Sequence, residues 1–182
     1  MITSKDGNYS LRPIETSDLQ LIQKWRNDKN TLPNVREYRL MSMPHIRKWH
    51  DSMVLDNKFE MFIMQTSNQE PVGVCGLTYI DWKNRNADLH FAVYKDSVWI
   101  DDKYSNIFYP IIVDYAFKNL DMNRIYVEMY EIDKKKVDFF SKKGFNKDAC
   151  LRKQYYYDGR HWDSYIYSLL KSEYIVSTGE RR

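Results

Sequence analysis

The feature that most constrains this fold is a regular succession of strand-like and helix-like segments along the whole chain. Apolar side chains alternate cleanly at 124–130, the period that places every second residue on one face of a sheet. Leu19, Ile22 and Trp25 instead recur at helical spacing. The order is strand, two helices, three strands, helix, strand, helix and two strands. Such an order predicts an α+β or α/β three-layer domain with a largely antiparallel sheet.

Local signals set the expected boundaries of these segments. Residues 16–18 offer a helix N-cap, Pro44 suits a first helical turn, and Gly144 suits the position just after a helix. Strands are expected at 9–13, 59–65, 72–79, 87–94, 124–130, 151–157 and 162–170. Helices are expected at 18–28, 44–55, from 106 or 109 to 119, and at 134–143.

Length and composition predict one domain over residues 1–182, with a core at about 9–174 and a polar C-terminal tail at 175–182. No stretch reaches the roughly 18 apolar residues of a membrane span, and the polar N-terminus lacks the apolar segment of a signal peptide. Cys75 and Cys150 lie far apart, which fits a reducing compartment and neither a disulfide framework nor a zinc site. We therefore expect a cytoplasmic protein with no metal and no membrane partner.

A net charge of +3 does not demand nucleic acid as a partner. Basic residues do gather at 134–153. They form either a solvated helix face or a surface that attracts a phosphorylated ligand.

Four fragments in order, at 9–28, 70–94, 113–145 and 151–174, resemble the GNAT acetyltransferase superfamily. The last fragment, LRKQYYYDGRHWDSYIYSLLKSEY, looks like the C-terminal hairpin of the RimJ/RimL- and PseH-like branch. The resemblance implies a mixed, mostly antiparallel sheet flanked by about four helices, with the fourth and fifth strands splayed apart. It also implies an N-acetyltransferase that moves an acetyl group from acetyl-CoA to a primary amine.

In this family the coenzyme arm lies between the splayed strands and pairs with exposed backbone, as an added strand would. The resemblance carries the following residues to the cofactor: Phe91, Ala92, Val93, Lys103, Tyr104, Ser105, Asn106, Asp133, Lys136 and Phe140.

Asp88 is the predicted catalytic base, because relatives carry an acidic residue at this place on the fourth strand. His90 is the second candidate, since it lies two residues on and faces the same side. Local pairing of Asp88 and simple packing of His90 remain open alternatives. Phe140 stands where relatives often carry a tyrosine acid, so either the thiolate leaves unaided or a hydroxyl from 155–157 serves.

The segment 99–106 departs from the family, whose diphosphate-binding loop uses glycines to bring backbone N–H groups round the anion. Here there is no glycine, and Asp101 and Asp102 stand beside the expected phosphates. The loop then binds CoA with fewer amides, or basic residues take over the phosphates. The third alternative is a non-catalytic binding module that keeps only the fold.

Two acceptors fit the resemblance. A PseH-like enzyme acts on a nucleotide-linked 4-amino-6-deoxy sugar, whereas a RimJ/RimL-like enzyme acts on a protein N-terminus. A basic groove favours the sugar nucleotide, and an acidic groove favours a peptide amine or polyamine. Homodimer formation is left open. The predicted substrate-binding residues are Trp25, Arg26, Asn27, Arg39 and Tyr156.

Overall fold

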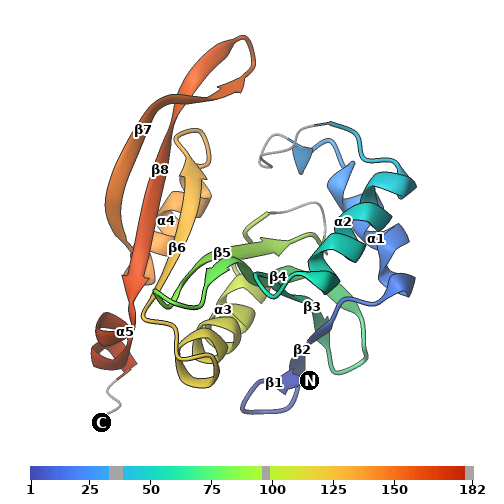
Figure 1. Ribbon diagram of the computed structural model, residues 1–182, viewed down its shortest axis with the longest axis horizontal. Helices are drawn as coiled ribbons and strands as arrows, with labels where there is room; N and C mark the ends of the chain where they lie inside the picture. The colour runs from blue at the N-terminus through green and yellow to red at the C-terminus, as the bar shows by residue number, and fades with distance from the viewer. Residues whose placement is uncertain (33–38, 96–98, 179–182) are drawn as a thin grey trace.

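The computed structural model describes residues 1–32, 39–95 and 99–178 (Figure 1). Its centre is an eight-stranded sheet with the order β1-β2-β3-β4-β5-β6-β8-β7. The strands are β1 (Ile2–Thr3), β2 (Tyr9–Pro13), β3 (Glu60–Thr66), β4 (Pro71–Asp81), β5 (Asn86–Val93), β6 (Arg124–Tyr130), β7 (Asn146–Tyr157) and β8 (Arg160–Leu170). The helices are η1 (Thr16–Asp18), α1 (Leu19–Arg26), α2 (Met43–Leu55), α3 (Tyr104–Asp114), the π-helical η4 (Tyr115–Asn119), α4 (Lys134–Lys142) and α5 (Lys171–Thr178).

Helices cover both faces of the sheet, which gives the three layers that the sequence predicted (Figure 1). Successive residues of β3 show the division. Phe62 faces the cluster formed with α3 and α4, whereas Ile63 faces the cluster formed with α1 and α2. Since side chains alternate across a strand, β3, β4 and β5 each contribute to both cores.

Neighbouring strands pair antiparallel except for β5 and β6, which run parallel. The parallel ladder is short. It joins Asn86 to Arg124, Ala87 to Ile125 and Asp88 to Tyr126, and no later pair follows. Beyond Asp88, β5 stays paired with β4 as far as Val93, whereas β6 stays paired with β8 as far as Tyr130. The predicted mostly antiparallel sheet with splayed central strands is therefore confirmed, and we call the opening between β5 and β6 the slot.

Several local predictions are confirmed, and others need correction. Gly144 follows α4 with φ +88°, the left-handed conformation that favours glycine. By contrast α3 begins at Tyr104, earlier than expected, so Pro110 lies inside the helix. At the C-terminus α5 reaches Thr178, so part of the segment expected as a polar tail is helical. Within the described ranges, no helix is both long and apolar enough to span a membrane.

Candidate active site

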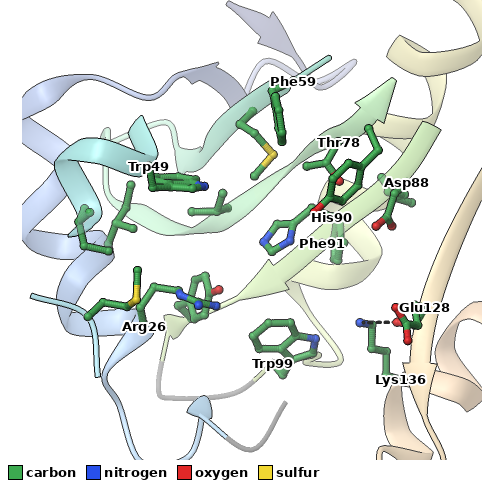
Figure 2. Close-up of a pocket in the computed structure, with 18 of the residues that line it drawn as sticks. Arg26, Trp49, Phe59, Thr78, Asp88, His90, Phe91, Trp99, Glu128 and Lys136 are labelled. Carbon is green, nitrogen blue, oxygen red and sulfur yellow. Dashed lines mark hydrogen bonds between the residues drawn. The ribbon is translucent and has the colours of Figure 1, made fainter. Parts of the chain in front are cut away.

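A pocket of about 520 Å³ lies where α1 and α2 face the slot (Figure 2). Aromatic side chains contribute much of its wall, among them Trp49 from α2, Phe59 from the loop before β3, and Trp99. Carboxylates lie at the slot side, from both strands that border the opening. The pocket is therefore an apolar cavity with a polar edge, the usual composition of a small-molecule site.

Asp88 and His90 both line this pocket from β5. They lie two residues apart, so both side chains project from the same face of the strand (Figure 2). Asp88 belongs to the last residue pair between β5 and β6, and His90 lies just beyond it. The structure thus brings the two predicted catalytic residues together at the point where the slot begins.

The β6 wall supplies a second carboxylate, Glu128, which the sequence reading missed. Its Oε1 accepts a hydrogen bond of 2.6 Å from Oγ of Ser164, a fully buried residue of β8. Lys136 of α4 donates from Nζ to the backbone carbonyl of Glu128 over 3.4 Å, as Figure 2 shows. The same Nζ lies 5.4 Å from the centre of the Trp99 ring.

Asp133 fixes the start of α4, because its Oδ1 accepts the backbone N–H of Lys136 over 3.1 Å. Burial raises the pKa of the Asp133 carboxyl, and the nearby Lys136 opposes that shift. Asp133 therefore acts here as a helix cap that sets the position of Lys136.

Backbone groups of both strands face the slot. The N–H of Tyr94 bonds to Val72 of β4, and the N–H of Val93 bonds to Trp99 on the opposite side. Because the direction alternates along a strand, the N–H and C=O of Phe91 also point away from β4, into the slot. On β6 the N–H of Glu131 bonds to Asp163 of β8, so the same alternation turns the Glu128 backbone toward the slot. These edges fit an extended arm with amide groups, such as the pantetheine of acetyl-CoA.

The N-terminus of α3 has a different character. Asp101 Oδ1 accepts the N–H of Ser105 over 2.6 Å, and Asp101 Oδ2 accepts the N–H of Tyr104 over 3.0 Å. The Ser105 hydroxyl donates to the same carboxylate over 3.0 Å. The helix expected to begin at 106 or 109 therefore begins earlier, with Asp101 accepting the amide hydrogens of its first turn. A side-chain carboxylate thus holds the groups that the family offers to a diphosphate.

The other predicted cofactor residues lie in three different environments. Lys103 and Asn106 are exposed at the start of α3, with Lys103 Nζ 4.9 Å from the Tyr104 ring centre. Ala92, Val93 and Phe140 are buried in the core. Of the predicted cofactor residues, Phe91 and Lys136 line the pocket.

Among the predicted substrate residues, Arg26 lines the pocket and interacts with the hydroxyl of Tyr94. Burial raises the pKa of Tyr94 to about 12, and Arg26 opposes that rise. Trp25 stacks on Tyr94 with ring centres 5.2 Å apart, behind the pocket wall. Asn27 exchanges two hydrogen bonds with the backbone of Met41, so it holds the pocket wall together.

Two predicted substrate residues lie elsewhere. Tyr156 is 62% exposed on β7 and contacts His161, and Arg39 is exposed next to the loop before α2. Of the three tyrosines at 155–157, Tyr155 stacks on Tyr130 with ring centres 3.7 Å apart. It is Tyr130, from β6, that reaches the pocket. No cluster of three or more His, Cys, Asp or Glu that could hold a metal ion occurs in the part of the chain described.

The sequence profile of the acetyltransferase (GNAT) domain matches residues 11–166. The chain belongs to the GNAT acetyltransferase family. Membership supports acetyl-CoA as the cosubstrate of this GNAT protein, as the sequence predicted.

Individual relatives are distant in sequence. The spermidine N(1)-acetyltransferase of Vibrio cholerae is 21% identical and aligns over 93% of this chain and 97% of its own. The uncharacterized N-acetyltransferase p20 of Bacillus licheniformis is 25% identical over 96% and 99%. A crystal structure of the Vibrio cholerae spermidine N-acetyltransferase with CoA and spermine superposes with a TM-score of 0.85, at 21% identity over 92% and 98% of the two chains. These relatives confirm the GNAT fold and do not indicate the RimJ/RimL- or PseH-like branch.

Proposed function

We propose that this GNAT protein transfers the acetyl group of acetyl-CoA to a primary amine of a small molecule. The observation that carries the proposal is the parting of β5 and β6 immediately after Asp88 and Tyr126. That parting exposes strand edges for the acyl donor, and it opens onto the pocket that holds Asp88 and His90.

The chemistry requires a neutral amine, because an ammonium has no lone pair with which to attack a thioester. Asp88 and His90 are the groups proposed to take the proton, directly or through water. The N–H of Phe91, turned toward the slot, is the proposed donor to the developing oxyanion.

Polyamines are the first acceptors to test. Their support comes from the Vibrio cholerae relative, which is named as a spermidine N(1)-acetyltransferase. The carboxylates of Asp88 and Glu128 and the ring faces of Trp49 and Trp99 also suit a cationic amine. Arg26 and Lys136 in the same pocket balance the two carboxylates, so net charge alone does not select a polyamine over a singly charged amine.

The amino-sugar and N-terminal peptide acceptors find no support among the relatives described above. They belong in the same substrate panel, because Arg26 offers a cation that could meet a sugar phosphate. The cytoplasmic location likewise remains a prediction, and homodimer formation remains open.

The experiment is a calorimetric titration with acetyl-CoA, followed by measurement of thiol release with spermidine, spermine, a nucleotide-linked amino sugar and a short peptide. We expect binding in the micromolar range and amine-dependent thiol release with one class of acceptor. No binding at millimolar acetyl-CoA would remove the proposal.

A non-catalytic binding module is the second candidate function. Two observations favour it, namely the occupation of the α3 amides by Asp101 and the absence of a hydroxyl at Phe140. Turnover with any amine would end that alternative.

A further inference from the structure

The position that the resemblance assigns to the general acid carries a side chain that cannot donate a proton in this chain. Phe140 is 0% exposed, with the rings of Tyr109, Phe139 and Phe145 against it. It has no proton and no charge to offer to a departing thiolate. If the chain catalyses acetyl transfer, any group that stabilises the sulfur must come from another position.

Lys136 lies one helical turn before Phe140, and residues four apart share one face of a helix. Its side chain reaches the slot, where Nζ donates to the Glu128 carbonyl and lies over the Trp99 ring (Figure 2). The Asp133 cap fixes the backbone from which this side chain extends. Lys136 is thus a cation of α4 in the pocket wall, directed into the slot from the Phe140 face.

Neighbouring lysines do not share this placement. Lys134 and Lys135, in the same turn, are exposed. Lys143, at the other end of α4, donates to Asn106 Oδ1 over 2.7 Å, near the start of α3. The run of basic residues around 134–143 is therefore divided by the fold, and Lys136 is the member that lines the pocket.

We propose that Lys136 is a catalytic residue whose ammonium stabilises the thiolate that leaves in acetyl transfer, in place of the family's tyrosine. The inference rests on the proposed function. In the step, the amine nitrogen first forms a bond to the acetyl carbon, and the carbonyl electron pair moves onto oxygen. The carbonyl then re-forms as the carbon–sulfur bond breaks and its electron pair stays on sulfur. The amine proton passes to the base at Asp88 or His90, and the thiolate takes its proton from water after release.

The ordinary pKa values of the two groups decide whether Lys136 would donate a proton to the thiolate or stabilise it as a charge. A lysine ammonium has an ordinary pKa of about 10.4 and an alkyl thiol such as that of cysteine about 8.5. The thiolate is therefore the weaker base by roughly two pK units, so the proton stays on nitrogen and the ammonium acts as a fixed charge.

The test compares Lys136→Met and Lys136→Arg with Lys135→Met, the exposed control on the same turn. Three quantities are measured: kcat, KM for acetyl-CoA, and the pKa of the thiol of bound CoA by ultraviolet difference spectroscopy. We expect Lys136→Met to lower kcat on the order of 10²-fold with KM within about threefold, since the charge acts mainly in the transition state. The thiol pKa of bound CoA should rise in that variant, because the thiolate loses its neighbouring cation.

Lys136→Arg keeps the charge and should recover part of kcat, whereas Lys135→Met should match the wild type. A raised KM with unchanged kcat in Lys136→Met would overturn the inference and show that the lysine only binds the donor. An unchanged thiol pKa would overturn it as well. The proposed function fails separately, when the wild type neither binds CoA nor turns over.

Discussion

The carboxylate of Asp101 accepts the backbone N–H of Ser105 over 2.6 Å and so closes the N-terminus of α3 from within the chain. In this family that helix end binds an anion, because its amides point outward and the helix dipole favours negative charge. Here an anion of the protein already sits there. The donor's diphosphate must therefore compete with Asp101 or bind elsewhere.

Replacing Asp101 with alanine should strengthen CoA binding by about fivefold, close to 1 kcal/mol, because the N–H groups of Tyr104 and Ser105 become available. Pantetheine, which lacks the diphosphate, should bind equally well to both proteins. Calorimetric titration with the two ligands checks this. Asp102→Ala removes an exposed neighbouring charge without touching the cap, so it controls for long-range repulsion. Equal CoA affinities in Asp101→Ala and the wild type would show that the diphosphate does not use these amides.

One of the two residues is expected to be the base, and its replacement, Asp88→Asn or His90→Ala, should lower kcat/KM on the order of 10²-fold. Steady-state rates across neutral pH distinguish them, since the variant without the base also loses the acidic limb of the pH profile. Asp51→Asn, at a carboxylate that is 75% exposed on α2, is the matched control and should keep the wild-type rate. If both pocket variants retain wild-type rates, water or the substrate itself takes the proton.

The ion pair between Arg12 and Asp18 should make stability fall in acid. Burial raises the pKa of Asp18, but hydrogen bonds from Arg12 and from the Glu15 N–H outweigh that effect and hold its pKa below the ordinary value. The stabilisation is therefore present above the unfolded pKa of about 3.9 and is lost as pH falls through the lower folded value. Asp18→Asn should cost about 1.5–3 kcal/mol at pH 7, with the difference from wild type shrinking below pH ~4. Denaturant titrations at both pH values measure it, and a difference independent of pH would contradict the assignment.

Two glycines should respond differently to alanine. At Gly76, which pairs with His90, a Cβ would lie 2.2 Å from the Glu60 carbonyl oxygen and 2.7 Å from the Met61 Cα. Both obstacles are backbone, so we expect a loss of about 3 kcal/mol or more. At Gly144 a Cβ would meet only Leu169 Cδ1, at 3.8 Å, and the cost should be about 1–2 kcal/mol from the positive φ. Thermal unfolding of both variants measures the two losses of stability. A larger loss for Gly144→Ala than for Gly76→Ala would contradict the prediction.

Much of the fold follows from local pattern. The strand Arg124–Tyr130 lies where alternation placed it, because one face is buried over most of its length. The first strand, Tyr9–Pro13, also has the expected bounds. The start of α3 was harder. The carboxylate that accepts its first amide hydrogens comes from Asp101, two residues before the helix N-cap. Proline is normally favoured in the first turn of a helix, so Pro110 predicted a later start, whereas it lies deep in the helix.

The site was predictable only in part. Asp88 and His90 were found because resemblance fixes the strand that borders the slot. Glu128 was missed because a carboxylate at a polar position of an alternating strand looks solvent-exposed; only the divergence of β5 and β6 turns that face into a pocket. Trp25 was assigned to substrate because tertiary packing on Tyr94 leaves no mark in the sequence.

Because β5 and β6 share just three residue pairs, each half of the sheet reaches the slot with an edge that pairs with no strand across it. An acyl donor that hydrogen-bonds to both edges would connect β5 and β6 through one continuous ladder of hydrogen bonds. Ligand at a hundred times its Kd adds about 2.7 kcal/mol to global stability. Amide hydrogen exchange should then slow along β6 and β8, and the two halves of the protein should melt as a single unit.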